Sequence, residues 1–144
     1  MQVLKILSII WKSGAEMSML ASGEIEMKNH KVVPPEIMKA AEQVFPQIED
    51  WFKSWSNVKP IDITIQKTLH QYCGWTKNES IINWLNNDMK STELFHDWTC
   101  VLAKNGWIDI YEDYRQFEND ESKKMAQEIY ERAVVFAKKG AEHE

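Results

Sequence analysis

The two residues best suited to chemistry are His96 and Cys100, which stand four positions apart. Residues at this spacing lie on one face of an α-helix, so the imidazole and the thiol would be neighbours. A thiolate beside a histidine is a typical arrangement of a cysteine nucleophile and its base. No third residue that would orient the histidine is evident, and the surrounding helix is strongly apolar. We therefore predict that the pair packs in a helical core, that the chain has no catalytic residues, and that it is not an enzyme.

The remaining cysteine and histidines do not form a pattern typical of a metal or cofactor site. Cys73 and Cys100 are far apart, and none of the four histidines has a second histidine within four residues. Free cysteines in apolar helical segments usually behave as small buried hydrophobic residues. No glycine follows a predicted strand as it would in a phosphate-binding loop. The sequence thus predicts no metal ligands and no cofactor.

The charge of the chain argues against a dominant role in binding nucleic acid. The formal net charge is −5, and residues 1–60 are neutral, so the excess of acids lies in the second half. Phosphate binding needs clustered lysine and arginine side chains. An acidic stretch at 109–121 is either a solvated loop or a patch for a basic partner. The seven tryptophans have mainly apolar and acidic neighbours, which favours packing in cores and interfaces over base stacking.

An apolar run at residues 3–11 has the appearance of a signal sequence. Lys5 interrupts it, Lys12 follows it, and no small-residue cleavage site comes after it. The run is also too short to span a bilayer. We expect an amphipathic helix at residues 2–12, no membrane association, and a cytoplasmic location.

Period-two alternation follows this helix and predicts a β-hairpin. Met17 and Met19 alternate with polar residues, as do Ile25 and Met27, and Gly23 lies in the turn between them. A peptide can add to the edge of such a hairpin as a third strand. The side chains expected to contact that peptide are Glu16, Ser18, Leu20, Glu24, Glu26 and Lys28. Their three acids would favour a basic, extended peptide, although the same residues are equally typical of an ordinary solvent-facing strand pair.

The rest of the chain has helical periodicity. Pro35 begins one helix, Pro46 interrupts it, and a second short helix follows before a boundary at 57–60. Four helical segments are expected after this boundary, with caps at Thr76, Ser91 and Asp120. Residues 107–111 alternate weakly and could form a short strand. The predicted fold class is α+β, mostly α: an αββαα unit at residues 1–57 and a helical domain at 61–144.

Roughly residues 1–56 resemble the TubC N-terminal docking domain family. The resemblance rests on the order and spacing of glycine, methionine, proline and aromatic positions: Gly14, Met17, Met19, Gly23, Ile25, Met27, Pro35, Glu36, Ile37, Met38, Ile48, Trp51 and Phe52. It implies an αββαα module whose hairpin receives a short peptide from a partner protein. It also implies relatives at the front of plasmid and phage replication proteins. The chain departs from the family at Phe45, where a basic residue is frequent.

Three hypotheses about function follow from these patterns. The first is a docking or adapter protein that binds a partner peptide along the hairpin. The second is a nucleic-acid accessory factor of phage or plasmid replication, with residues 61–115 folded like a winged helix. The third is an inhibitor from a mobile element that blocks a host enzyme through its acidic surface. The sequence leaves the partner and the oligomeric state open.

Overall fold

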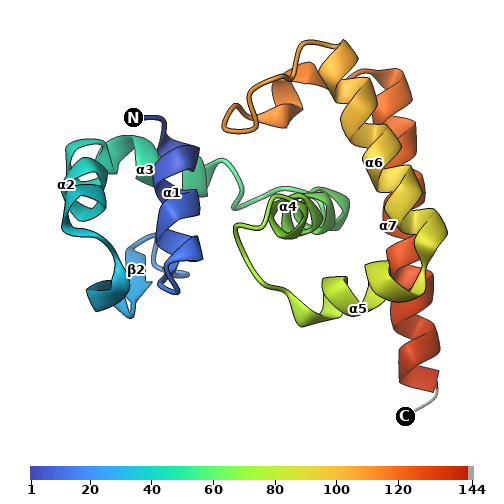
Figure 1. Ribbon diagram of the computed structural model, residues 1–144, viewed down its shortest axis with the longest axis horizontal. Coiled ribbons are helices and arrows are strands. Elements are labelled where there is room, and N and C mark those ends of the chain that lie inside the picture. The colour runs from blue at the N-terminus through green and yellow to red at the C-terminus, as the bar shows by residue number, and fades with distance from the viewer. Residues whose placement is uncertain (143–144) are drawn as a thin grey trace. The chain divides into compact units, whose positions relative to one another are not determined.

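The computed structural model of the chain describes residues 1–142 (Figure 1). The chain divides into two compact units, and each consists of two segments of sequence. Unit 1 comprises residues 1–59 and 72–76, and unit 2 comprises residues 60–71 and those from 77 onward. The described part contains seven α-helices and one two-stranded antiparallel sheet, which confirms the predicted α+β, mostly α class. None of its helices is both long enough and apolar enough to cross a membrane.

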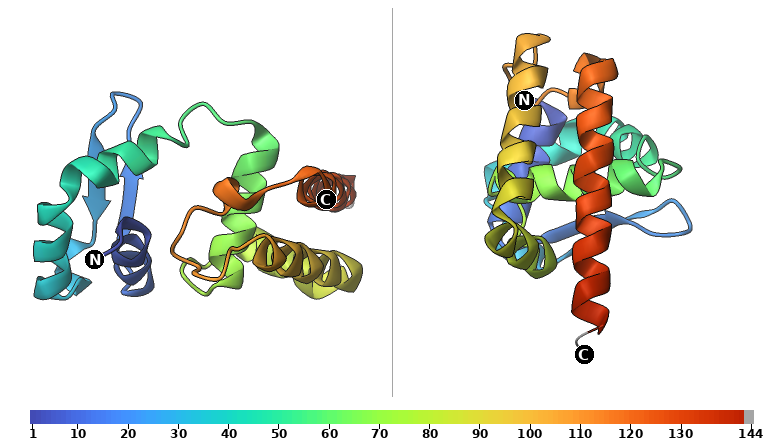
Figure 2. Two further views of the ribbon diagram at one scale, coloured as in Figure 1. Left: turned by 90° about the horizontal axis from the view of Figure 1, so that it is seen from above. Right: turned by 90° about the vertical axis from the view of Figure 1, so that its right-hand side faces the viewer.

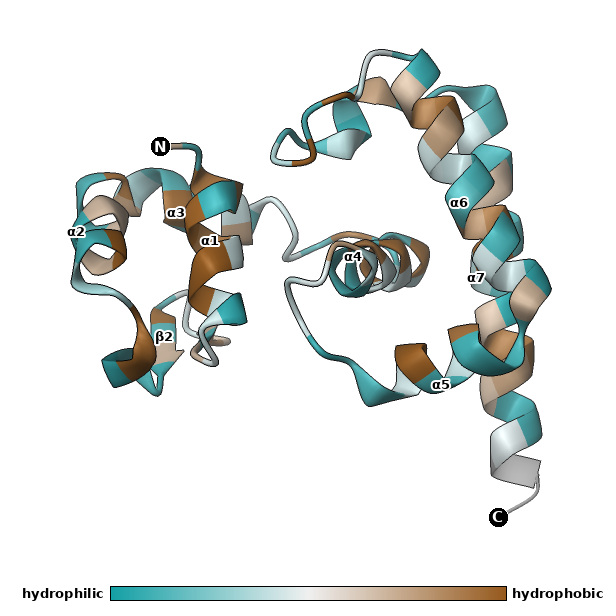
Figure 3. Ribbon diagram, in the orientation of Figure 1, coloured by the Kyte–Doolittle hydropathy of each residue, from teal (hydrophilic) through white to brown (hydrophobic). Residues whose placement is uncertain are grey.

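Unit 1 has the element order αββαα, with one 3₁₀ turn after the hairpin. Its elements are α1 (Val3–Lys12), β1 (Glu16–Met19), β2 (Ile25–Lys28), the 3₁₀ turn η1 (His30–Val32), α2 (Pro35–Gln43) and α3 (Phe45–Lys53). Apolar residues, brown in Figure 3, cover most of α1. The helix is thereby suited to a central position in the unit.

The end of α1 is fixed by a glycine. Gly14 has a φ of +100°, in the left-handed region that glycine adopts without steric cost. This conformation lets the Ala15 amide donate to the Ile10 carbonyl at 3.3 Å, which closes the helix end. The chain can then reverse directly into β1.

Two prolines set the boundaries of α2 and α3. Pro35 occupies the first turn of α2, where a missing amide donor costs nothing. Pro46 likewise lies in the first turn of α3. Val44, between the two helices, has a non-helical backbone conformation. The predicted interruption at Pro46 is therefore a clean break between two short helices.

One buried apolar cluster joins the elements of unit 1. Ile6, Leu7 and Ile10 of α1 and Ile48 of α3 are completely buried, and Met17 of β1 is 7% exposed. The other buried members are Ala15, Val33, Ile37 and Ala41. Burial of each large aliphatic side chain contributes roughly 1.5–3 kcal/mol. This cluster covers the apolar face of the hairpin, which would be exposed to water in an isolated hairpin.

Unit 2 is entirely helical apart from its loops. Its elements are α4 (Pro60–Tyr72), α5 (Glu79–Asn87), α6 (Met89–Lys104), the 3₁₀ turn η2 (Tyr114–Phe117) and α7 (Asp120–Glu142). Helices α6 and α7 run antiparallel and lie side by side (Figures 1 and 2). Phe95, Trp98 and Leu102 of α6 and Ile129 of α7 are at most 1% exposed. Trp98 also meets Tyr114 edge to face, with ring centroids 5.2 Å apart.

Three helices of unit 2, α5, α6 and α7, have caps other than the predicted ones. The N-cap of α5 is Asn78, whose side chain accepts a hydrogen bond from the Ile81 amide at 3.1 Å, so the cap predicted at Thr76 is wrong. The N-cap of α6 is Asp88, and Ser91 lies within the first turn. Asparagine and aspartate are as effective as serine at this position, so composition alone did not distinguish them.

The connection between α6 and α7 contains no strand. Residues 107–111 form loop and turn, so the short strand considered there is absent. At the end of the connection, Asn119 and Ser122 cap α7 reciprocally. The Ser122 amide donates to Asn119 Oδ1 at 2.8 Å, and the Asn119 amide donates to Ser122 Oγ at 2.9 Å. Asp120, the predicted cap, is the first residue of the helix itself.

Candidate functional site

The hairpin of unit 1 has the register that the alternation of its sequence predicts. Its two strands pair antiparallel and are the only strands in residues 1–142 (Figure 2). The paired residues are Glu16 with Lys28, Met17 with Met27, Ser18 with Glu26, and Met19 with Ile25. Methionine and isoleucine therefore share one face, and the polar side chains share the other.

The turn of the hairpin determines which backbone groups point outward. The Gly23 amide donates to the Leu20 carbonyl at 2.9 Å, and the Leu20 amide donates to the Glu24 carbonyl at 2.8 Å. Gly23 has a φ of +91°, as the glycine of a three-residue hairpin loop requires. Leu20 and Glu24 are therefore a hydrogen-bonded pair. Because bonded and non-bonded pairs alternate, Ser18 and Glu26 form the next bonded pair.

The non-bonded pairs direct their backbone groups away from the partner strand. Met17 and Met19 point theirs toward the outer edge of β1, and Ile25 and Met27 point theirs toward the outer edge of β2. No third strand pairs with either edge in the part of the chain that the structure describes. These four apolar residues therefore supply the backbone donors and acceptors that lie along the two edges.

The two strands differ in their contacts with the helices. Helices α1 and α3 both pack against β1, whereas the main contact of β2 is with β1 itself. The edge of β2 is therefore the candidate for pairing with another strand, although its residues 25–27 are partly buried. A strand that added there would pair with Ile25 and Met27 and would lie beside the side chains of β2.

The predicted contact residues lie where the sequence placed them, on the polar face and in the turn. Glu16, Ser18, Glu24 and Lys28 are exposed, Leu20 is 41% exposed, and Glu26 is partly buried. Lys28 lies directly opposite Glu16, so it offsets one of the three acids and leaves a net negative face. Glu24 and Glu26, both on the β2 side, have no basic residue paired with them across the sheet.

Asn29 is a residue of this site that the sequence reasoning missed. It has a φ of 61°, the one positive value outside glycine in residues 1–142. Its side-chain amide donates to the Gly14 carbonyl at 3.3 Å, which ties the end of β2 to the start of β1. Asparagine tolerates this conformation better than other L-residues. Its position directly after an alternating run was the available signal.

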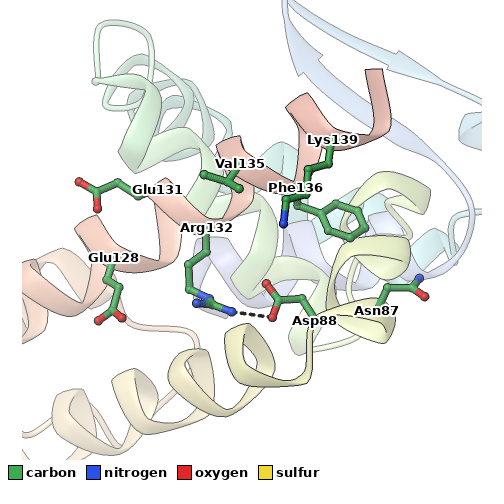
Figure 4. A pocket seen from close by; sticks show the side chains of 8 residues that line it. All are labelled: Asn87, Asp88, Glu128, Glu131, Arg132, Val135, Phe136 and Lys139. Atoms are coloured by element: carbon green, nitrogen blue, oxygen red, sulfur yellow. Dashed lines mark hydrogen bonds and ion pairs between the residues drawn. The ribbon is translucent and has the colours of Figure 1, made fainter. Parts of the chain in front are cut away.

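A second candidate site is a cleft of about 510 Å³ between α7 and the α5–α6 junction (Figure 4). Arg132 lies at its centre. Its Nη2 donates to Asp88 Oδ1 and its Nε donates to Ser91 Oγ, both at 2.7 Å. Ser91 Oγ in turn donates to Asp88 Oδ2 at 2.5 Å. Burial alone would raise the pKa of Asp88, but the hydrogen bonds from Ser91 and Arg132 lower it below its usual value.

This arrangement is structural rather than a ligand site. The Arg132 guanidinium already donates hydrogen bonds to the residues that cap α6. Acidic residues also outnumber basic residues in the lining of the cleft. Replacing Arg132 with methionine, which keeps most of the side-chain length, is expected to lower the free energy of unfolding by about 1.5–3 kcal/mol. Arg132→Lys retains the positive charge but lacks the several donors of the guanidinium. Its free energy of unfolding should therefore fall less than that of Arg132→Met. Urea denaturation measures both, and equal stability of Arg132→Met and wild type would contradict this role.

The structure places His96 and Cys100 on the surface, so the prediction that they are buried is wrong. Both side chains are exposed, and Cys100 Sγ lies 3.7 Å from His96 Nε2. The buried stripe of α6 runs instead through Ser91, Phe95, Trp98 and Leu102. Cys73 is partly buried, and its burial raises the pKa of the thiol to about 11. Few Cys73 thiolates are therefore present at neutral pH.

The acidic stretch at 109–121 is mostly loop and turn, with Glu112, Asp120 and Glu121 exposed, and Asp113 is held by local hydrogen bonds. The Asp113 carboxylate caps η2 by accepting from the Arg115 amide at 2.9 Å, and it also pairs with the Arg115 guanidinium at 2.7 Å. Burial raises the pKa of Glu118, and the nearby Asp62 carboxylate raises it further. With no strand at 107–111, the described chain also lacks the wing that a winged helix would use.

Comparison of the chain with protein-family models, with curated proteins and with solved structures found no match in any of the three.

Proposed function

We propose that this protein is a non-catalytic docking protein that binds an extended peptide of a partner along the outer edge of β2. The observation that carries the proposal is that Ile25 and Met27 pair with no third strand in the described residues and direct their backbone groups outward, on the strand against which α1 and α3 do not mainly pack. Main-chain hydrogen bonds to such an edge give affinity without requiring a deep pocket.

The side chains beside this edge favour a basic partner. Glu24 and Glu26 lie on β2 and are not offset by a paired base. A peptide with lysine or arginine at alternate positions would place these cations beside the two carboxylates, because side chains of adjacent strands lie opposite one another. The order αββαα of unit 1 is also the order that the resemblance to TubC docking domains implies.

The anchoring of the hairpin suits this role. The apolar cluster holds Met17 and the inner faces of Ile25 and Met27, and Asn29 ties the strands together at their open end. A strand held in this way is ordered before the partner arrives. Binding then costs less conformational entropy than it would on a flexible segment.

The test uses a short synthetic peptide that alternates valine and lysine, and the same peptide with glutamate in place of lysine. In the full-length protein, the lysine peptide is expected to slow hydrogen exchange of the Ile25 and Met27 amides. These amides are the donors that a third strand would pair. Two-dimensional NMR reads each of them separately. Unchanged exchange at both amides under saturating peptide would overturn edge binding.

Charge reversal at Glu24 and Glu26 tests the specificity. Each cross-strand charge pair contributes about 0.2–1 kcal/mol, so the double substitution to lysine is expected to weaken binding of the lysine peptide by about tenfold. Binding of the glutamate peptide should strengthen. The matched control is Glu42→Lys with Asp50→Lys, which changes the charge of unit 1 equally at exposed helix positions. Equal effects of the two double variants would mean that net charge, not the hairpin, determines binding.

A further inference from the structure

The outward face of α6 is a continuous exposed stripe of mostly polar residues. Its members follow the three- and four-residue spacing of one helix face, and all are exposed: Glu93, His96, Asp97, Cys100, Ala103 and Lys104. Hydrophilic positions recur along this helix in Figure 3. The opposite stripe of α6 packs in the core of unit 2, so the helix holds the exposed side chains on a rigid support.

His96 and Cys100 in this stripe have the geometry of two zinc ligands. Zinc binds thiolate sulfur at about 2.3 Å and imidazole nitrogen at about 2.0–2.1 Å, in tetrahedral geometry. Two ligands at these lengths and at the tetrahedral angle lie about 3.6 Å apart. The observed separation of Cys100 Sγ and His96 Nε2 is 3.7 Å. The two atoms therefore lie at the separation that a shared zinc ion requires.

The described residues of one chain supply only two of the four ligands of a closed zinc site. No group of three or more histidine, cysteine, aspartate or glutamate side chains is placed to hold a metal within residues 1–142. Stable zinc sites are usually four-coordinate. The described residues place no further ligand beside the pair, and the simplest source of the other two is the same pair on another copy.

We propose that two copies of this chain bind one zinc ion through His96 and Cys100 of each, with their α6 helices antiparallel about a twofold axis. The twofold axis would pass through the zinc ion, at a level along α6 midway between His96 and Cys100. His96 of one copy would then face Cys100 of the second copy. The result is a Cys₂His₂ site formed only in the dimer, with the isologous symmetry that most homodimers have.

The charges along α6 fit this antiparallel pairing. Glu93 lies one turn before the ligand pair and Lys104 one turn after it, so each glutamate would face the lysine of the second copy. The two Asp97 carboxylates would approach each other near the axis. Without a cation, repulsion between these two carboxylates disfavours the dimer. With zinc between the helices, the charge of the ion attracts both carboxylates and favours the dimer. Surface ion pairs contribute at most about 1 kcal/mol, so the dimer should depend on the metal.

The first test is the mass of the full-length protein in solution, measured by light scattering under a reductant that is not a thiol. Zinc chloride is expected to double the mass at one zinc per two chains, and EDTA should reverse this. Cobalt(II) in place of zinc should give the intense visible bands of a tetrahedral thiolate site. An unchanged mass with zinc, or one zinc per chain without a dimer, would overturn the proposal.

Substitutions separate this site from nonspecific zinc binding. Cys100→Ser and His96→Ala are each expected to abolish the zinc-dependent dimer, and Cys73→Ser should retain it. Because Cys100 and His96 are exposed, these substitutions should leave the fold intact, and circular dichroism checks this. Glu93→Lys should weaken the dimer, and adding Lys104→Glu should restore it if the helices are antiparallel. A zinc dimer that persists in Cys100→Ser would overturn the assignment.

Discussion

Replacing Ile48 with alanine is expected to lower the free energy of unfolding of unit 1 by about 2–5 kcal/mol. Ile48 is completely buried in the cluster that also holds Met17 of the hairpin. Truncation removes apolar contacts and leaves a cavity that the rigid surroundings fill only in part. Because the hairpin relies on this cluster, its amides should lose protection from hydrogen exchange along with those of α1.

Ile48→Val is the matched control. It removes a single methylene, so a loss of only about 0.5–1.5 kcal/mol is expected. The two variants together show whether packing density at this position sets the stability of the hairpin. If Ile48→Ala left exchange in the hairpin unchanged, the strands would be held by something other than the cluster.

Acidification is expected to destabilise the protein by about 3 kcal/mol through His70 alone. His70 is 8% exposed, and burial lowers its pKa from 6.5 to about 4. In the unfolded chain the imidazole of His70 therefore takes up a proton near pH 6.5, whereas in the folded chain it does so only near pH 4. The contribution of neutral His70 is fully present above pH 6.5 and is lost progressively as the pH falls to 4.

The comparison with His70→Gln isolates this effect. Urea denaturation of wild type and variant across this range should show a steeper fall of stability with acid in the wild type. Glu118 acts with the opposite sign, since burial raises its pKa and its protonation on acidification stabilises the folded state. Glu118 is present in both proteins, so it cancels in the difference. Parallel pH profiles would show that His70 is not the group responsible.

The hairpin was predictable because several local signals agreed. Met17 and Met19 alternate with polar residues, and Gly14 and Gly23 take the left-handed conformations that the helix end and the turn require. The proline positions fixed the break between α2 and α3 in the same way. These features act over a few residues, so no knowledge of distant contacts was needed.

The features that sequence reasoning missed depend on contacts between distant segments. Whether Cys100 is buried depends on which face of α6 packs in the core, and Cys100 and Ala103 are weakly polar residues on the face that stays exposed. Residues 107–111 alternate as a strand would, but no neighbouring strand is present in the described chain to pair with them. The cap of α6 is reinforced by Arg132, which lies far away in the sequence.

Because each unit consists of two separate segments of sequence, a single cut in the chain cannot separate the two units completely. Residues 72–76, which begin at the last residue of α4, belong to unit 1, and Trp75 among them is only 1% exposed. A recombination breakpoint at 59–60, where the helical half begins, would transfer the hairpin without its last segment. A fragment meant to contain the whole of unit 1 should therefore extend through residue 76.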